Sequence, residues 1–141
     1  MSDLEKALCI AVTAHRGQRD KAGRPYILHP LRLMQKCSTE AEMIVAVLHD
    51  VIEDTDVTTD HLEREGFDAE VIQALRCLTK TKGEHYPDFI ERVSKNQLAR
   101  RVKILDLTDN MDASRLTSFT DADAARMKRY IAALAYLRRE T

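Results

Sequence analysis

Four polar side chains that can bind metal or exchange protons follow one another closely after an apolar segment: His49, Asp50, Glu53 and Asp54. An imidazole beside three carboxylates can hold a divalent cation or move a proton. The alternative is an ordinary solvated helix face. On the same side of the predicted helix, however, the residues one turn earlier are apolar. Carboxylates crowded in a half-buried place repel one another unless a cation is present, so a metal-binding or catalytic role is the preferred interpretation.

A further carboxylate, Asp109, lies where an apolar side chain is expected. In a helix predicted over residues 97–111 it falls in the stripe formed by Leu98, Val102 and Leu105. A buried carboxylate needs a positive partner, which is either a buried arginine or a metal ion. Taken together with the His-Asp pair, Asp109 is predicted to be a metal ligand.

His29, which directly precedes Pro30, is a weaker candidate when judged alone. A single histidine before a helix is more often a cap or a hydrogen-bonded core residue than a ligand. The same reasoning applies more strongly to His15, His61 and His85, which are predicted to lie outside the site.

The composition indicates that helices position these residues. The chain has 141 residues, which suits one domain over residues 1–141. Apolar residues make up 44% and aromatic residues 5%, and four glycines with three prolines are too few for many short strands. We therefore predict an all-α fold, a single compact helical bundle of about seven to nine helices.

Hydrophobic periodicity and capping residues set the expected helices. The central one begins at the capping residues Ser38, Thr39 and Glu42 and continues through Asp54. In the last helix, Met127, Tyr130, Ile131 and Leu134 are expected to face inward. The remaining helices are expected over residues 3–18, from about 30, and over 57–66, 69–79, 86–95, 97–111 and 123–139.

Charge and cysteine content narrow the classes of partner and compartment. A net charge of −1 argues against a general nucleic-acid binder. Residues 15–36 carry six Lys/Arg and one acid, whereas residues 40–70 carry eleven acids and one base, as a site for a cation and an anionic substrate would require. Three widely spaced cysteines form no disulfide or zinc pattern, and no apolar run suits a membrane span, so a cytoplasmic protein is expected.

Several local strings together resemble a known family. They are Ala14-His-Arg-Gly-Gln18, Gly23-Arg-Pro-Tyr-Ile-Leu-His-Pro30, Val47-Leu-His-Asp-Val-Ile-Glu-Asp-Thr55, Leu78-Thr-Lys80 and Val102-Lys-Ile-Leu-Asp-Leu-Thr-Asp109. From about Ala7 to Leu116 the chain resembles the hydrolase domain of the RelA/SpoT proteins and the stand-alone small alarmone hydrolases, which are HD-domain phosphohydrolases.

The resemblance implies a metal site and an activity. It implies one divalent metal, usually Mn²⁺ with Fe²⁺ or Co²⁺ as alternatives, and removal of the 3′-pyrophosphate from guanosine tetra- and pentaphosphate. No synthetase domain follows, so only hydrolysis is expected. The residues implied are His29, His49, Asp50 and Asp109 as metal ligands and Glu53 and Asp54 as the catalytic acids. The cations Arg19, Lys21, Arg24, Lys80 and Arg115 are candidates for holding the substrate.

Two departures from the family pattern concern the nucleoside pocket. The family usually has Arg-Lys where this chain has Asp20-Lys21. After the metal aspartate the family commonly reads Arg-Leu-x-Asn-Met-Arg, and the Asn of this string helps to bind the nucleoside. With Asp109 as the metal aspartate, Ala113 stands at the position of that Asn. Two rival functions therefore stay open: a phosphatase or phosphodiesterase for another nucleotide, and a nucleotide sensor without hydrolysis. No oligomeric state is indicated.

Overall fold

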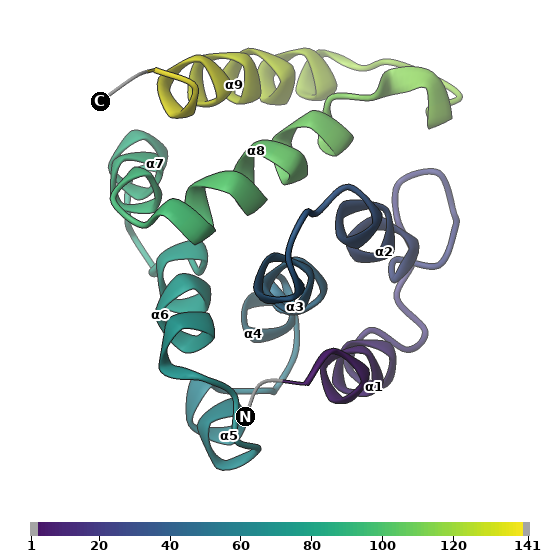
Figure 1. Ribbon diagram of the computed structural model, residues 1–141. Coiled ribbons are helices and arrows are strands. Elements are labelled where there is room, and N and C mark those ends of the chain that lie inside the picture. The colour runs from purple at the N-terminus through teal and green to yellow at the C-terminus, as the bar shows by residue number, and fades with distance from the viewer. Residues whose placement is uncertain (1–2, 140–141) are drawn as a thin grey trace.

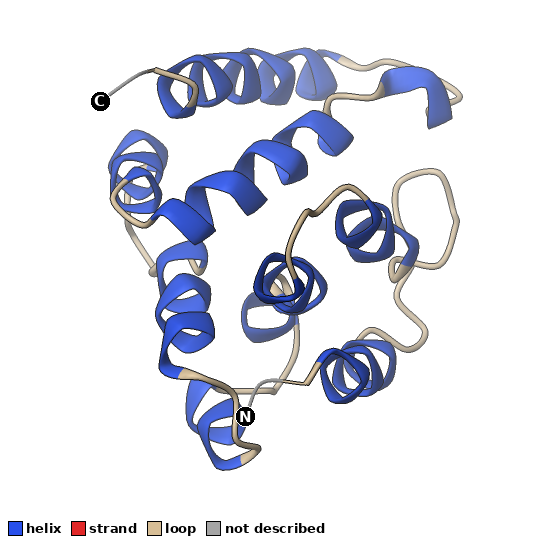
Figure 2. Ribbon diagram, viewed as in Figure 1, coloured by secondary structure: helices blue, strands red, loops and turns tan. Residues whose placement is uncertain are grey.

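The computed structural model describes residues 3–139, so the outermost residues of the predicted 1–141 domain lie outside the described part. Within this part the chain forms nine α-helices and one short 3₁₀ helix, and no β-strand (Figures 1 and 2), which confirms the all-α prediction. The elements are α1 (Leu4–Ala14), α2 (Leu28–Gln35), α3 (Glu40–Leu48), α4 (Val51–Asp54), α5 (Thr59–Arg64), α6 (Ala69–Leu78), α7 (Tyr86–Ser94), α8 (Gln97–Asn110), η1 (Ala113–Arg115) and α9 (Asp121–Leu137).

Helix α3 is the centre of the bundle. Figure 1 shows it nearly end-on, with α1, α2, α6 and α8 arranged around it, and each of these helices contacts it. Every residue from Ile44 to Leu48 is at most 1% exposed. The helix begins where predicted, because the Thr39 side chain accepts a hydrogen bond from the main-chain nitrogen of Glu42 (3.2 Å). A helix that is apolar on all sides can only be stable in the interior.

The central helix is interrupted at His49 and Asp50, which corrects the prediction of one continuous helix through Asp54. Helix α3 ends at Leu48, and α4 begins at Val51. The His49 side chain donates from Nδ1 to the main-chain oxygen of Ala46 (2.6 Å), the acceptor that the Asp50 amide would use in an unbroken helix. Adjacent residues of a regular helix point in different directions. At this interruption, however, His49 Nε2 and Asp50 Oδ2 lie 2.9 Å apart and face the same site.

Two other helix boundaries differ from the prediction by a few residues. Helix α1 ends at Ala14 rather than near residue 18, and the chain then turns through Gly17, whose φ of 84° suits glycine. Helix α9 begins earlier than expected because Thr120 and Asp123 form a capping box. None of the helices in the described part of the chain is both long and apolar enough to cross a lipid bilayer.

Helix α9 covers only part of the bundle, packing on α7 and α8. Leu134 faces this contact and is 9% exposed, as predicted, but Ile131 is 53% exposed and does not face inward. Helix α9 buries a narrow stripe that also contains Ala133 and Leu137, because it lies at the edge of the fold and packs mainly on α7 and α8.

This difference has a measurable consequence for stability. Leu134→Ala should lower the free energy of unfolding by about 2 kcal/mol or more, because it removes buried apolar contacts and leaves a cavity. Ile131→Ala, the matched control on the same helix, should stay within about 0.5 kcal/mol of the parent. Urea denaturation measures both values. Equal losses would mean that Ile131 is buried in solution.

Candidate functional site

Four side chains from three parts of the fold meet beside the α3–α4 break. They are His29 on α2, His49 and Asp50 at the break, and Asp106 on α8. Each offers one ligand atom, and these atoms lie within 4.8 Å of one another. His29 Nε2 is 2.9 Å from Asp106 Oδ1, and His49 Nε2 is 2.9 Å from Asp50 Oδ2 and 3.3 Å from Asp106 Oδ1.

The second nitrogen of each imidazole is held by an acceptor. His29 Nδ1 donates to Asp109 Oδ2 (2.6 Å), and His49 Nδ1 donates to the main-chain oxygen of Ala46 (2.6 Å). In the neutral rings the unprotonated Nε2 atoms therefore face carboxylate oxygens, and a cation at their centre removes the repulsion between the lone pairs. Metal-binding histidines almost always have such a partner on the other nitrogen. The donor set thus fits a divalent metal ion.

The two carboxylates of the group are held ionised. Burial alone would raise the pKa of Asp106, but the charges of Lys103 and His49 and hydrogen bonds from the histidines bring it well below its usual value. Burial likewise raises the pKa of Asp50, but the charge and hydrogen bond of His49, together with the hydrogen bond from Tyr26, bring it below its usual value. For His49 the balance is reversed, because burial lowers its pKa and the two aspartates raise it well above the ordinary value.

Several further side chains orient the two aspartates. Lys103, which is largely buried, lies with its Nζ 2.9 Å from Asp106 Oδ2. Asn110 donates from Nδ2 to Asp106 Oδ1 (3.1 Å), and the Tyr26 hydroxyl donates to Asp50 Oδ2. Burial beside Asp50 raises the pKa of Tyr26, so the phenol remains a donor. Each aspartate is therefore fixed by a donor outside the four-residue group.

The structure places Asp106, and not Asp109, in this group, which differs from the predicted ligand set. Asp109 is buried, as expected, but its Oδ1 and Oδ2 accept hydrogen bonds from Arg32 Nε and Nη2 (both 2.9 Å), and Oδ2 also accepts from His29 Nδ1. It lies on the far side of the His29 ring from the group. The carboxylate has the arginine partner that was the alternative interpretation of a buried acid.

Aligning the family string Arg-Leu-x-Asn-Met-Arg after Asp106 instead of after Asp109 changes which residues of this chain match it. With Asp106 as the aspartate of the motif, Asn110 matches the asparagine, and Asp112 stands where the following Arg is common. Counted from Asp106, the asparagine that seemed absent at Ala113 is present as Asn110. The sequence could not separate the two aspartates, since both are buried on the same face of α8. Asp106 follows Val102 by four residues and was equally visible as a polar intrusion.

Glu53 and Asp54 extend along α4 next to the group. Glu53 Oε1 accepts a hydrogen bond from the main-chain nitrogen of Lys80 (3.2 Å), and Gln18 Nε2 donates to the main-chain oxygen of Asp54 (3.3 Å). Burial, with the charge of Asp50, raises the pKa of both carboxyls. A carboxyl with a raised pKa is a better proton acceptor and donor near neutral pH.

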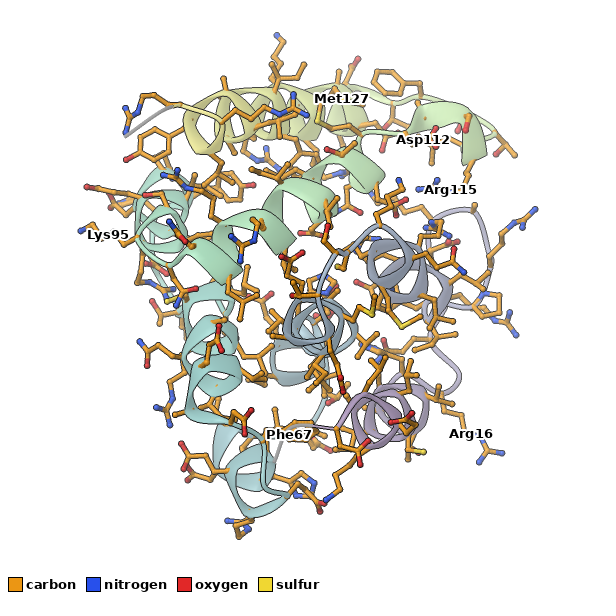
Figure 3. The ribbon with its side chains drawn as sticks, viewed as in Figure 1. Arg16, Phe67, Lys95, Asp112, Arg115 and Met127 are labelled. Atoms are coloured by element: carbon orange, nitrogen blue, oxygen red, sulfur yellow. The ribbon has the colours of Figure 1, made fainter. Side chains whose placement is uncertain are left out.

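A cavity of about 320 Å³ adjoins the group through Tyr26 and His29. It extends beneath residues 19–22 towards the end of α8, η1 and α9. Figure 3 shows Asp112 and Arg115 on the segment after α8, near the end of α9 that carries Met127. The charged residues lining the cavity are Arg19, Asp20, Lys21, Arg32, Asp112, Arg115, Asp123 and Arg126.

Three of the five predicted substrate-binding cations line this cavity, namely Arg19, Lys21 and Arg115. Arg24 is exposed and does not line the cavity. Lys80 does not line it either, and its main-chain nitrogen donates a hydrogen bond to Glu53. Sequence reasoning missed Arg32 and Arg126. Arg32 follows His29 by one helical turn, and this spacing is the signal that could have indicated it.

Comparison with known proteins gives consistent relatives. No family model matches the chain. It is 30% identical over 119 residues to a guanosine-3′,5′-bis(diphosphate) 3′-pyrophosphohydrolase of Aquifex aeolicus, covering 78% of this chain and 17% of the relative. It is 37% identical over 84 residues to a protein of the same name from Borreliella burgdorferi, covering 57% of this chain and 12% of the relative. The chain thus spans less than a fifth of the length of these curated relatives.

The solved structures include one that matches over nearly the whole chain. A metazoan orthologue of SpoT, described as hydrolysing ppGpp, superposes with a TM-score of 0.80 at 25% identity, covering 98% of this chain and 86% of the other. The helical fold, the His-Asp group at the α3–α4 break and these relatives agree. The chain therefore belongs to the HD-type hydrolases of the RelA/SpoT family.

Proposed function

We propose that this chain is a single metal-dependent HD domain that removes the 3′-pyrophosphate from guanosine 3′,5′-bis(diphosphate) and related alarmones. The observation that carries the proposal is the group of His29, His49, Asp50 and Asp106 at the edge of a cavity whose lining contains five Lys/Arg and three Asp. The names of the relatives support the same reaction.

The four-residue group would hold the metal ion. Two imidazole nitrogens and two carboxylate oxygens form a mixed donor set that suits Mn²⁺, with Fe²⁺ or Co²⁺ as alternatives. When bound, such an ion lowers the pKa of water and polarises a phosphoryl oxygen. Lys103 and Tyr26 keep the aspartates oriented, and Asp109 and the Ala46 carbonyl keep the imidazoles oriented.

Glu53 and Asp54 would handle the protons. In the reaction, water attacks the phosphorus attached to the ribose 3′-oxygen, the bond between that oxygen and phosphorus breaks, and pyrophosphate leaves. One carboxylate accepts the proton of the attacking water, and a carboxyl donates a proton to the departing 3′-oxygen. The raised pKa values of both side chains favour these roles.

Product analysis tests the proposal. The Mn²⁺-supplemented protein should release intact pyrophosphate from guanosine 3′,5′-bis(diphosphate) and leave GDP, as measured by chromatography. The adenine analogue in the same assay tests the choice of base. Release of orthophosphate would contradict the proposal and favour a phosphatase. Tight binding without turnover under Mn²⁺, Fe²⁺ and Co²⁺ would favour a sensor.

A further inference from the structure

The carboxylate of Asp109 connects the metal group to the cavity. Arg32 forms a two-pronged pair with it, Nε to Oδ1 and Nη2 to Oδ2, each at 2.9 Å. His29 Nδ1 donates to the same Oδ2. These three hydrogen bonds make Asp109 a buried anchor, and both of its partners, Arg32 and His29, line the cavity.

Arg115 is held by the same residue. Its Nη2 donates to the main-chain oxygen of Asp109 (3.0 Å) and lies 3.5 Å from Oδ2, while Nη1 donates to Asp112 (3.1 Å). The side chains of Arg32 and Arg115 are 28% and 26% exposed, and both line the cavity. One buried carboxylate thus fixes two guanidinium groups. Asp112 pairs with the second of them, and these two carboxylates use only part of the five N–H groups that each guanidinium carries, so others remain to bind an anion.

The position of His29 tells which part of a substrate this pair would meet. His29 directs Nε2 to the metal group and Nδ1 to Asp109, so the imidazole ring separates the metal group from the arginines. A phosphate bound by Arg32 therefore lies away from the bond that is broken. In a nucleotide with diphosphates at both the 3′ and 5′ positions, that is the 5′-diphosphate.

We infer that Arg32 and Arg115 form a subsite for the diphosphate that is not hydrolysed, and that Asp109 is the positioning residue that orients both. The assignment to the 5′-diphosphate rests on the proposed function, but the anion subsite itself does not. Asp109 couples the subsite to the metal ligand His29 through one carboxylate.

Kinetics with two substrates test which diphosphate is bound. Arg32→Met should raise KM for guanosine 3′,5′-bis(diphosphate) by roughly 10- to 100-fold, because charge-assisted hydrogen bonds to the substrate are lost. Its kcat should change by less than about threefold. For guanosine 3′-diphosphate with a free 5′-hydroxyl, KM should barely change. The control is Arg16→Met, an exposed arginine whose side chain points away from the molecule (Figure 3). Equal effects on both substrates would overturn the assignment.

Binding of inorganic pyrophosphate separates the subsite from the proposed function. Titrated calorimetrically into the metal-free full chain, pyrophosphate should bind roughly 10-fold more weakly to Arg32→Met than to the parent or to Arg16→Met. Unchanged affinity would overturn the subsite. If Arg32→Met binds pyrophosphate more weakly but the parent protein does not hydrolyse guanosine 3′,5′-bis(diphosphate), the subsite is supported and the proposed function is rejected. Thermal melts verify folding, and Arg32→Lys, which keeps the charge but not the two-pronged pair, should bind with intermediate affinity.

The positioning role of Asp109 is tested by non-additivity. If Asp109 holds Arg32 in place, Arg32→Met should change pyrophosphate affinity by less than about threefold in an Asp109→Asn background. An undiminished effect in that background would mean that Arg32 binds the anion without help from Asp109.

Discussion

Replacing Asp106 by alanine should remove both the bound metal and the hydrolytic activity. Its Oδ1 lies within 3.3 Å of the Nε2 atoms of both His29 and His49, whereas Asp50 Oδ2 is 2.9 Å from His49 Nε2 but 3.9 Å from His29 Nε2. Its loss would also leave the buried Lys103 without its partner. Metal content after Mn²⁺ reconstitution and pyrophosphate release measure the two effects. Stoichiometric Mn²⁺ in the variant would exclude Asp106 from the ligand set.

Asp109→Asn is the matched comparison on the same helix. Because Asp109 contacts His29 only through Nδ1, the variant should keep the metal but bind it roughly 10- to 100-fold more weakly, as is usual when the partner of a ligand histidine is lost. A metal loss as complete as that of Asp106→Ala would show that Asp109 coordinates the ion in solution.

Glu53→Gln should have the second large effect, a loss of kcat on the order of 10²–10⁴-fold with metal content and melting temperature kept. Glutamine retains the oxygen that accepts the hydrogen bond from the Lys80 amide, so the local structure should survive while the proton acceptor is lost. Asp54→Asn is the parallel variant. Near-normal kcat in Glu53→Gln would assign the proton transfer to Asp54 or to the metal ion alone.

Local sequence signals were sufficient for much of the fold. The central helix was predicted from the Thr39 cap and the apolar segment after it, which are both local features of the sequence. The all-α class was predicted from the scarcity of glycine and proline. Periodicity was less reliable for α9, where Ile131 is apolar yet exposed, because the pattern does not reveal how many neighbours a helix at the edge has.

The chemistry of the site was also visible in the sequence, in residue types rather than in their arrangement. His29, His49 and Asp50 were predicted to meet, and the structure brings them together. The interruption after Leu48 was not predicted, because it depends on the His49 side chain taking a main-chain acceptor.

The sequence by itself determined that this protein is helical and indicated that histidines and carboxylates are buried together, because both follow from local periodicity and from the cost of burying charge. Only the tertiary structure decided between Asp106 and Asp109. The two lie three residues apart on one helix and are buried alike, and they differ in what other helices bring to them. The two imidazoles reach Asp106 with Nε2, whereas Arg32 reaches Asp109. That choice depends on contacts between residues far apart in the chain, which no local pattern encodes.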